Sequence, residues 1–208
     1  MVNYHHYINN NAFLKETRMR IVAGSAKGRI LKSPCGRKLR PTSVKVKTAF
    51  FNIVGDSIGD AGFLDLFAGT GNIGLEALSR GAERAVFVEK DKHTIQTLRQ
   101  NIFRTDMQEF ATVLAYDIFK ALKVLERKSG KFDVVYIDPP YKYQGIAKIL
   151  DTLYSKNLVN NGGIIVVERD KRAAEEEAWL KKIPLLFWKR KVYGDTALVF
   201  LKVKNKRS

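Results

Sequence analysis

Four consecutive residues, Asp138-Pro139-Pro140-Tyr141, place a carboxylate, a stiff turn and an aromatic ring directly after an apolar run. The prolines lack backbone N–H groups and restrict the turn, which fixes where the neighbouring groups point. The Asp138 carboxylate and the Pro139 carbonyl can accept hydrogen bonds from both N–H groups of an exocyclic base amine, so that the nitrogen lone pair faces a methyl donor. Tyr141 can stack on a flipped base. The tetrapeptide therefore predicts methylation of a base amino group, and the alternative interpretation is a turn that only ends a strand.

A glycine-rich segment, Gly69–Gly74, lies between a predicted strand over Phe63–Ala68 and a predicted helix over Ile73–Arg80. Glycine at positions 69, 71 and 74 allows a tight turn and the close approach of a ligand to the backbone. Glu89 follows about 20 residues after the first glycine, at the end of the next predicted strand, where an acid can hold ribose hydroxyls. Nicotinamide dinucleotide enzymes and S-adenosylmethionine enzymes share this arrangement.

Asp65 favours S-adenosylmethionine over a dinucleotide. It lies inside the strand before the loop, and a carboxylate there repels a pyrophosphate but attracts the sulfonium and ammonium groups of S-adenosylmethionine. Asp65, Glu89, Asp117 and Asp138 all fall at or near the C-terminal ends of successive predicted strands, the edge at which open α/β sheets bind ligands. The structural alternatives are a hydrogen bond that braces the loop for Asp65 and a helix cap for Asp117.

From Phe63 onward, short apolar runs alternate with longer helical stretches. This alternation predicts a parallel sheet covered on both faces, and Gly194-Asp195 predicts a turn that joins the last two strands. We therefore expect an α/β, Rossmann-like fold with a seven-stranded, mostly parallel sheet and a C-terminal antiparallel hairpin. The predicted strands are Phe63–Ala68, Ala85–Glu89, Thr112–Ala115, Phe132–Ile137, Ile164–Glu168, Leu186–Tyr193 and Thr196–Val203. The predicted helices are Ile73–Arg80, Lys92–Phe103, Phe119–Arg127, Ile146–Lys156 and Ala173–Lys181.

A small basic hairpin and one helix are predicted ahead of the sheet. Arg20–Ala23 and Arg29–Lys32 flank a link containing glycine, and Thr42 is placed to cap a helix whose apolar residues, up to Val54, share one face. Residues 1–18 are expected to be an extension, disordered or vector-derived, with Met19 as the true start. Residues 19–208 are expected to form a single domain, with an RNA-binding hairpin and helix over 19–57 and a catalytic α/β core over 58–208.

The chain carries a formal net charge of +16, and its basic residues gather toward both ends. Between Lys15 and Lys47 the only acid is Glu16, and a second basic stretch lies between Lys181 and Arg207. A strongly basic surface attracts phosphate backbones and releases their counterions. This distribution favours a nucleic-acid partner over a lysine-rich surface that serves only solubility. The predicted contacts are Arg20, Lys27, Arg29, Arg37, Lys38, Arg40, Lys45 and Lys47.

Cys35 is the only cysteine, which rules out an intrachain disulfide and a cysteine-based zinc cluster, so no metal site is expected. No apolar run is long enough to span a bilayer, and the first residues lack a signal-peptide core. These observations predict a cytoplasmic protein.

With these motifs placed, the chain resembles the class I methyltransferases, specifically the bacterial family that methylates a guanine N2 in 16S ribosomal RNA. The N-terminal segment narrows the family, because the glycine loop and Asp-Pro-Pro-Tyr are common to many amino-methylating enzymes. The sequence departs from the family pattern after Thr42, where lysines at 45 and 47 stand in place of arginines and the acids are missing, so bidentate contacts are lost. The resemblance covers about Met19 to Lys204, and its motifs are Met19–Gly24, Lys27–Leu31, Leu39–Thr42, Phe51-Asn52, Leu64–Gly74, Leu75–Arg80, Asp138–Tyr141 and Val167-Glu168.

The resemblance implies S-adenosylmethionine as cofactor and 16S rRNA as substrate, within an assembled or assembling small ribosomal subunit. It implies that Asp138–Tyr141 hold the guanine and that the basic hairpin and Arg40 grip the RNA. A monomer without a membrane partner is expected. The implied cofactor contacts are Asp65, Phe67, Gly69, Thr70, Gly71, Glu89, Lys90, Asp117, Ile118 and Asp138.

Other functions remain open at this point. A DNA adenine-N6 or cytosine-N4 methyltransferase uses the same tetrapeptide, although the chain has no room for a separate DNA-recognition domain. The remaining alternatives are N2-guanine methylation of another RNA, a non-catalytic RNA-binding protein that retains the fold, and a nicotinamide oxidoreductase.

Overall fold

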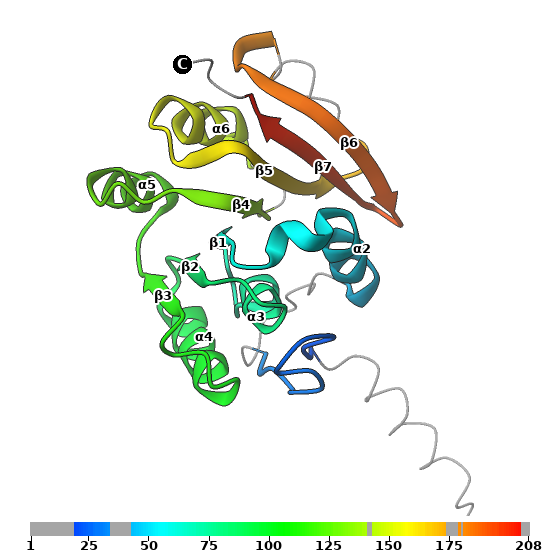
Figure 1. The fold of residues 1–208 in the computed structure, drawn as a ribbon, viewed down its shortest axis with the longest axis vertical. Helices are drawn as coiled ribbons and strands as arrows, with labels where there is room; N and C mark the ends of the chain where they lie inside the picture. Colours follow the sequence, from blue (N-terminus) through cyan, green and yellow to red (C-terminus); the bar gives the residue numbers. More distant parts are fainter. Residues whose placement is uncertain (1–18, 34–42, 141–142, 174–178, 180, 205–208) are drawn as a thin grey trace, which may run out of the picture.

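A computed structural model describes residues 19–33, 43–140, 143–173, 179 and 181–204. Its centre is a seven-stranded sheet in the order β3-β2-β1-β4-β5-β7-β6, in which the first five strands are parallel and β7 pairs antiparallel with both β5 and β6 (Figure 1). This confirms the predicted α/β, Rossmann-like sheet with its C-terminal hairpin. The strands are β1 Gly62–Leu66, β2 Arg84–Val88, β3 Ala111–Leu114, β4 Phe132–Ile137, β5 Val159–Asp170, β6 Leu185–Tyr193 and β7 Thr196–Val203.

Helices cover both faces of the sheet, because successive side chains of each central strand point to opposite sides. On one face, Phe63 and Tyr136 belong to a core shared with α2, α3 and α4. On the other, Leu64 and Val135 belong to a core shared with α5 and α6. The helices are α2 Val44–Val54, the 3-10 turn η2 Gly55–Ile58, α3 Asn72–Ser79, α4 Lys92–Arg104, α5 Ile118–Arg127 and α6 Ile146–Ser155.

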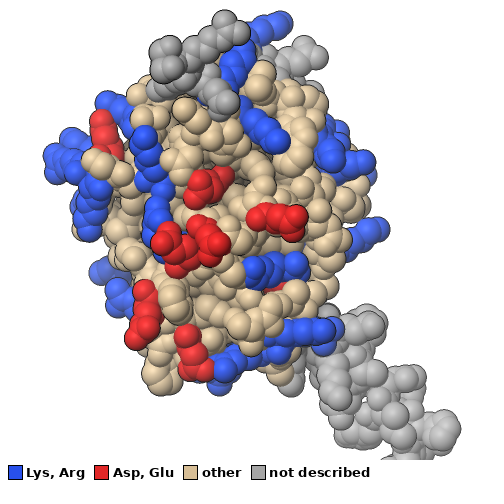
Figure 2. Space-filling view, in the orientation of Figure 1, with Lys and Arg blue, Asp and Glu red and all other residues tan. Residues whose placement is uncertain are grey.

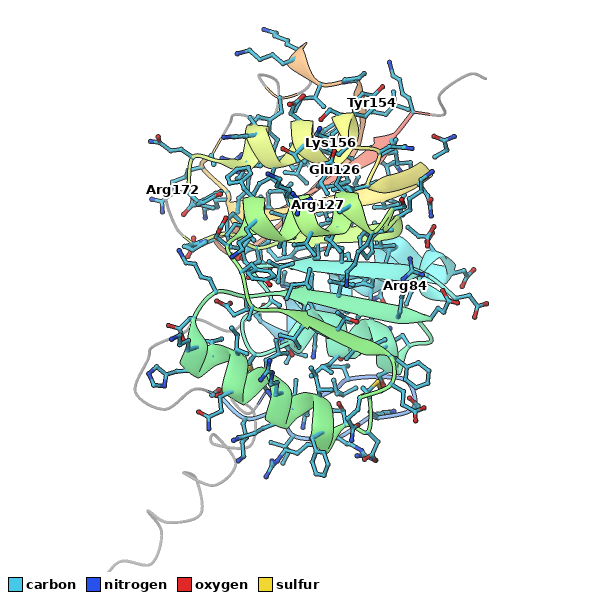
Figure 3. The ribbon with its side chains drawn as sticks, turned by 90° about the vertical axis from the view of Figure 1, so that its left-hand side faces the viewer. Arg84, Glu126, Arg127, Tyr154, Lys156 and Arg172 are labelled. Atoms are coloured by element: carbon cyan, nitrogen blue, oxygen red, sulfur yellow. The ribbon has the colours of Figure 1, made fainter. Side chains whose placement is uncertain are left out.

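The carboxyl ends of the parallel strands form one edge of the molecule. Arg84 begins β2 and Arg172 follows the end of β5, and Figure 3 labels them at opposite sides, with the carboxyl edge on the left. Figure 2 looks onto the other edge, where acidic side chains gather near the centre with Lys and Arg around them. The net positive charge is therefore not spread evenly over the surface.

The structure corrects several predicted boundaries. β1 ends at Leu66 and not at residue 68, because Phe67 turns the backbone into the left-handed region. β5 begins at Val159, earlier than predicted, and its register against β4 shifts where Gly162 has positive φ. The cap of α2 is Ser43, whose side chain accepts the Val46 N–H, so the prediction of Thr42 as cap was wrong. The predicted helix over 173–181 lies largely outside the described residues.

The predicted N-terminal hairpin exists as a tight turn with a single bridge, Arg20 to Ile30, and not as two strands. It is docked on α3. A Cβ on Gly24 would lie 1.6 Å from the Ser79 carbonyl oxygen, and the Ser25 N–H donates to that same oxygen at 2.8 Å. The turn is therefore part of the packed structure and not a free arm.

Candidate active site

The glycine loop joins β1 to α3 with left-handed backbone at Gly69 and Gly71, whose φ values are 54° and 87°. A Cβ on Gly71 would lie 2.5 Å from Leu98 Cδ1, and one on Gly74 would lie 2.3 Å from Phe87 Cε1. These two glycines are needed for packing against α4 and β2. A Cβ on Gly69 meets no described atom closer than 4.0 Å, so the backbone at Gly69 is where the loop leaves space for a ligand.

Phe67 has a φ of 66°, which is uncommon for a bulky side chain. Such backbone strain persists where the surroundings hold it, and it concentrates at ligand sites. The Phe67 ring packs edge-to-face on Tyr143, with 5.1 Å between centroids. Partial burial and the charge of Asp117 raise the pKa of Tyr143. The Phe67, Tyr143 and Asp117 side chains therefore lie near one another beside the glycine loop.

Asp65 is buried, and its Oδ2 accepts the Gly74 N–H at 3.0 Å. This confirms the interpretation of Asp65 as a brace for the loop, while its predicted contact with a cofactor stays a prediction. Burial raises the pKa of the Asp65 carboxyl to about 7, the Gly74 hydrogen bond acts against this rise, and the charge of Glu89 adds to it. Protonation of Asp65 therefore falls near neutral pH.

Asp65→Asn is expected to change how stability depends on pH. Because the folded-state pKa of about 7 exceeds the ordinary aspartate pKa of about 3.9, the folded protein holds this proton more tightly than the unfolded chain does. The free energy of unfolding therefore falls as pH rises between these two pKa values. Asparagine can keep the hydrogen bond to Gly74 without titrating. Between pH about 5 and about 8, the free energy of unfolding of the wild type should fall by on the order of 2–3 kcal/mol relative to that of the variant. Urea unfolding at both pH values checks this, and parallel pH profiles would contradict the assignment.

Glu89 is fixed by three backbone N–H groups. Its Oε2 accepts from Gly69 at 3.1 Å, and its Oε1 accepts from Lys90 at 2.8 Å and from Asp91 at 2.9 Å. The carboxylate therefore links the end of β2 to the glycine loop in a set position, with lone pairs left to accept further hydrogen bonds. This is the arrangement that binding of ribose hydroxyls requires. The Lys90 side chain is exposed.

Asp117 caps α5, with its side chain accepting the Lys120 N–H at 3.1 Å. The helix-cap interpretation is confirmed, and a contact with the cofactor stays a prediction. Ile118, the first residue of α5, is buried. Thr70 is also buried, and its carbonyl accepts a hydrogen bond at 3.0 Å from Asn101 of α4.

The Asp138-Pro139-Pro140 turn begins where β4 ends. The Asp138 N–H donates to the Leu66 carbonyl at 3.4 Å, which ties the turn to the end of β1, and the Tyr143 N–H donates to the Pro140 carbonyl at 3.1 Å. Asp138 and Pro139 are half-buried and Pro140 is exposed. The fourth residue of the motif, Tyr141, lies outside the described residues. The turn therefore meets the glycine loop at the carboxyl edge.

A buried pair lies on the strands that carry this turn. The Tyr136 hydroxyl donates to the Glu168 carboxylate in a short hydrogen bond between β4 and β5. Burial raises the pKa of Tyr136 well above its usual value, and the charges of Glu168, Asp138 and Asp65 add to the rise. Tyr136 is thus a neutral donor among carboxylates, which holds β4 and β5 together near the site.

Lys47 corrects the predicted RNA contacts. Its side chain is 1% exposed, and its Nζ lies 3.0 Å from Glu76 Oε2, 2.9 Å from Asn72 Oδ1 and within hydrogen-bond distance of the Arg20 carbonyl. Burial lowers the pKa of Lys47, and Glu76 offsets part of that effect. The side chain points into the core because it shares the apolar face of α2 with Phe50. Lys47 therefore supports the fold and cannot reach RNA.

Glu76, which the sequence analysis did not single out, organises this region. Its buried carboxylate also accepts the N–H groups of Val22 at 2.7 Å and Ala23 at 3.0 Å, and the Arg80 Nε at 2.9 Å. The N-terminal turn is thereby joined to α3 by charge-assisted hydrogen bonds. A lone glutamate in a helix that has no other charged residue does not by itself indicate this role.

The other predicted RNA contacts divide into three groups. Arg20, Lys27 and Lys45 are exposed. Arg29 is also exposed, but its guanidinium lies 2.7 Å from Asp106 and donates to the Arg104 carbonyl. Residues 37, 38 and 40 lie outside the described residues. The exposed lysines and arginines near the N-terminal turn remain available to a polyanion.

Two negative findings limit the kinds of site. Within the described residues, the His, Cys, Asp and Glu side chains form no group of three that could hold a metal ion. Across the same residues, no helix combines the length and apolarity that crossing a membrane requires.

Comparisons with known proteins match most of the chain. Residues 19–202 match the family described as "Conserved hypothetical protein 95". The chain is 35% identical over 184 residues to "Putative rRNA methyltransferase YlbH" of Bacillus subtilis, covering 88% of this chain and 98% of that protein. It is 31% identical over 182 residues to "Ribosomal RNA small subunit methyltransferase D" of Escherichia coli K12, covering 86% and 87%. A solved structure, "Putative methyltransferase yhhF from Escherichia coli", superposes with a TM-score of 0.77 at 30% identity, covering 91% of this chain and 99% of that one.

Proposed function

Because the chain belongs to the Conserved hypothetical protein 95 family, we propose that it transfers a methyl group from S-adenosylmethionine to the exocyclic N2 of a guanine in 16S rRNA. The observation that carries this proposal is the turn that begins at Asp138, held to the end of β1 beside the glycine loop. The proposal assigns binding of the base amine to this turn and binding of the nucleoside to the glycine loop beside it. The relatives named as rRNA methyltransferases cover nearly the whole described fold.

The residues at the carboxyl edge fit S-adenosylmethionine. The open backbone at Gly69 admits the ligand, the fixed Glu89 carboxylate accepts hydrogen bonds from hydroxyls, and the Phe67 and Tyr143 rings supply an apolar wall. When bound, the cofactor supplies an electrophilic methyl group on a sulfonium. Carboxylates at this edge favour a cationic ligand and disfavour the pyrophosphate of a nicotinamide dinucleotide.

The turn would act on the target amine by orientation. Asp138 and the Pro139 carbonyl accept hydrogen bonds from the two N–H groups of the amine, which turns the nitrogen lone pair toward the methyl group and stabilises the positive charge that develops on nitrogen. Proper alignment of two reactants can supply on the order of 7–11 kcal/mol of the barrier. The stiff proline pair keeps both acceptors in place while the base enters.

The partner we propose is the small ribosomal subunit, assembled or assembling, with the protein acting as a monomer in the cytoplasm. The exposed cations around the N-terminal turn support an RNA partner. Methylation of adenine or cytosine in DNA is the second candidate, because the exocyclic amines of these bases suit the same acceptors at the Asp138 turn.

The experiment supplies labelled S-adenosylmethionine with small subunits from cells lacking this methylation, free 16S rRNA, and DNA. Label is expected in 16S rRNA, and mass spectrometry of nuclease digests should find it on a guanine N2. Subunits from cells that already carry the modification are the matched control and should accept little label. Label confined to DNA, or found on adenine or cytosine, would contradict the proposal.

A further inference from the structure

An open groove runs along the outer side of α4, away from the candidate active site. It has a volume of about 510 Å³ and lies between α4 and the end of the N-terminal turn at Lys32. In Figure 3, α4 starts near the carboxyl edge and runs toward the opposite edge, with side chains projecting away from the sheet. No described carboxylate lines the groove. Its lining contains four cations, which are Lys32, Lys92, Arg99 and Arg104.

All charged side chains within α4 are basic. Its thirteen residues include no Asp or Glu, and its first turn holds Lys92, where a cation opposes the helix macrodipole. An acid in that turn would stabilise the helix. From Lys92 to Arg104 the helix axis extends roughly 18 Å at 1.5 Å per residue. This row of cations therefore has the length of a short stretch of polynucleotide backbone.

An aromatic ring lies among these cations. Phe103 is 69% exposed, the highest value for a large apolar side chain among the described residues, and it lines the same groove. Exposing a phenylalanine to water is unfavourable, so a partner that covers it would gain free energy. An aromatic ring between lysines and arginines is the pattern on which unpaired bases stack while phosphates meet the cations.

Hydrogen bonds of α4 hold the N-terminal turn, which lines the groove at Lys32, in a fixed position relative to the glycine loop. Asn101, buried in α4, accepts the Lys32 N–H at 2.7 Å and donates to the Lys32 carbonyl at 3.1 Å and to the Thr70 carbonyl at 3.0 Å. Arg29 ties the same turn to the end of α4 through Asp106. A polyanion in the groove would thus be held at a fixed position relative to the cofactor loop.

The geometry points to the α4 groove as a second RNA-binding site, which takes the sugar-phosphate backbone and an unpaired base of the substrate RNA beyond the contacts of the N-terminal turn. This inference rests on the proposed function for the identity of the RNA. Charge complementarity and the exposed Phe103 support a single-stranded or looped segment over an acidic protein. The groove would hold this segment while the target guanine enters the site at Asp138.

The test compares two triple variants that remove equal charge. The groove variant carries Lys92→Gln, Arg99→Gln and Arg104→Gln, and the control carries Lys123→Gln, Arg127→Gln and Lys128→Gln on and after α5, where Figure 3 labels Arg127. Filter binding to labelled 16S rRNA across salt concentrations should show roughly tenfold weaker binding for the groove variant, and a salt slope smaller by about two. The control should stay within about threefold of wild type, because its cations are not placed on the groove.

Phe103→Ala should weaken RNA binding by about fivefold or more with little change of the salt slope, because stacking does not release counterions. Binding of S-adenosylmethionine, measured by calorimetry, should be unchanged in all variants, which shows that the fold is intact. Equal loss of RNA binding in groove and control variants would overturn the inference. So would a groove variant that binds naked rRNA normally but small subunits weakly, because the groove would then contact a protein. Groove-dependent RNA binding by a wild-type protein that transfers no methyl group would overturn the proposed function and support this inference.

Discussion

Asp138→Ala is expected to lower the rate of methyl transfer at saturating substrates by about 100-fold to 1000-fold, the usual cost of losing one group that stabilises charge in a transition state. The carboxylate follows β4 directly, and its backbone is held to Leu66 beside the glycine loop. Without it, one N–H of the target amine loses its acceptor and the lone pair loses its orientation. Single-turnover measurements with 16S rRNA and labelled S-adenosylmethionine give this rate.

Separate binding measurements assign the loss to a step. If Asp138 acts on the amine, calorimetric affinity for S-adenosylmethionine should change by less than about tenfold while the rate falls far more. Equal losses in both would identify Asp138 as a cofactor ligand instead. Asp151→Ala, on the exposed side of α6, removes a carboxylate elsewhere and should leave both quantities at wild-type values. A rate within about threefold of wild type for Asp138→Ala would refute the catalytic assignment.

Lys47→Met is expected to lower the free energy of unfolding by about 3 kcal/mol, because it leaves the buried Glu76 carboxylate without the more buried of its two cations. The two groups lie 3.0 Å apart with side-chain exposures of 1% and 0%. Glu76 keeps the N–H groups of Val22 and Ala23 and the guanidinium of Arg80, so the variant should still fold. Urea unfolding monitored by circular dichroism measures the loss.

Lys45→Met is the matched control, because the same change is made two residues earlier on the exposed side of α2. It should alter stability by less than about 0.5 kcal/mol, and if Lys45 contacts RNA it should weaken RNA binding. Adding Glu76→Gln to Lys47→Met should cost less than the sum of the two single changes, because the ion pair is then removed as a unit. Equal stability of the two lysine variants would show that the buried pair contributes nothing.

The sheet could be predicted from the sequence because strand patterns are local. β4 and β7 have the predicted bounds, since each is a mostly apolar segment between clear turns. Where an end depends on one residue's backbone, as at Phe67, the apolar pattern continued past the true end of the strand. Ser43 and Thr42 are both good caps, and only the three-dimensional geometry of the first turn selects Ser43.

The site could be predicted only in part, because several of its residues act across long sequence distances. The glycines, Glu89 and the Asp138 turn belong to motifs with fixed spacing. Asn101 belongs to no local motif that could indicate its role, since its hydrogen-bond partners Lys32 and Thr70 lie 69 and 31 residues away in the sequence. Tyr143 follows the tetrapeptide closely. The position of its ring beside Phe67 depends on the conformation of the intervening turn, which the spacing of the residues does not determine.

The docking of the N-terminal turn on α3 has a consequence for how the chain folds during synthesis. Val22 and Ala23 leave the ribosome well before Glu76, the residue 54 and 53 positions later that accepts their N–H groups. Contacts of such separation form late, because the intervening chain must first be closed into a loop. Until α3 emerges, the carboxylate that accepts the Val22 and Ala23 N–H groups is missing, so the N-terminal turn takes its final position only after the glycine loop and α3 have been synthesised.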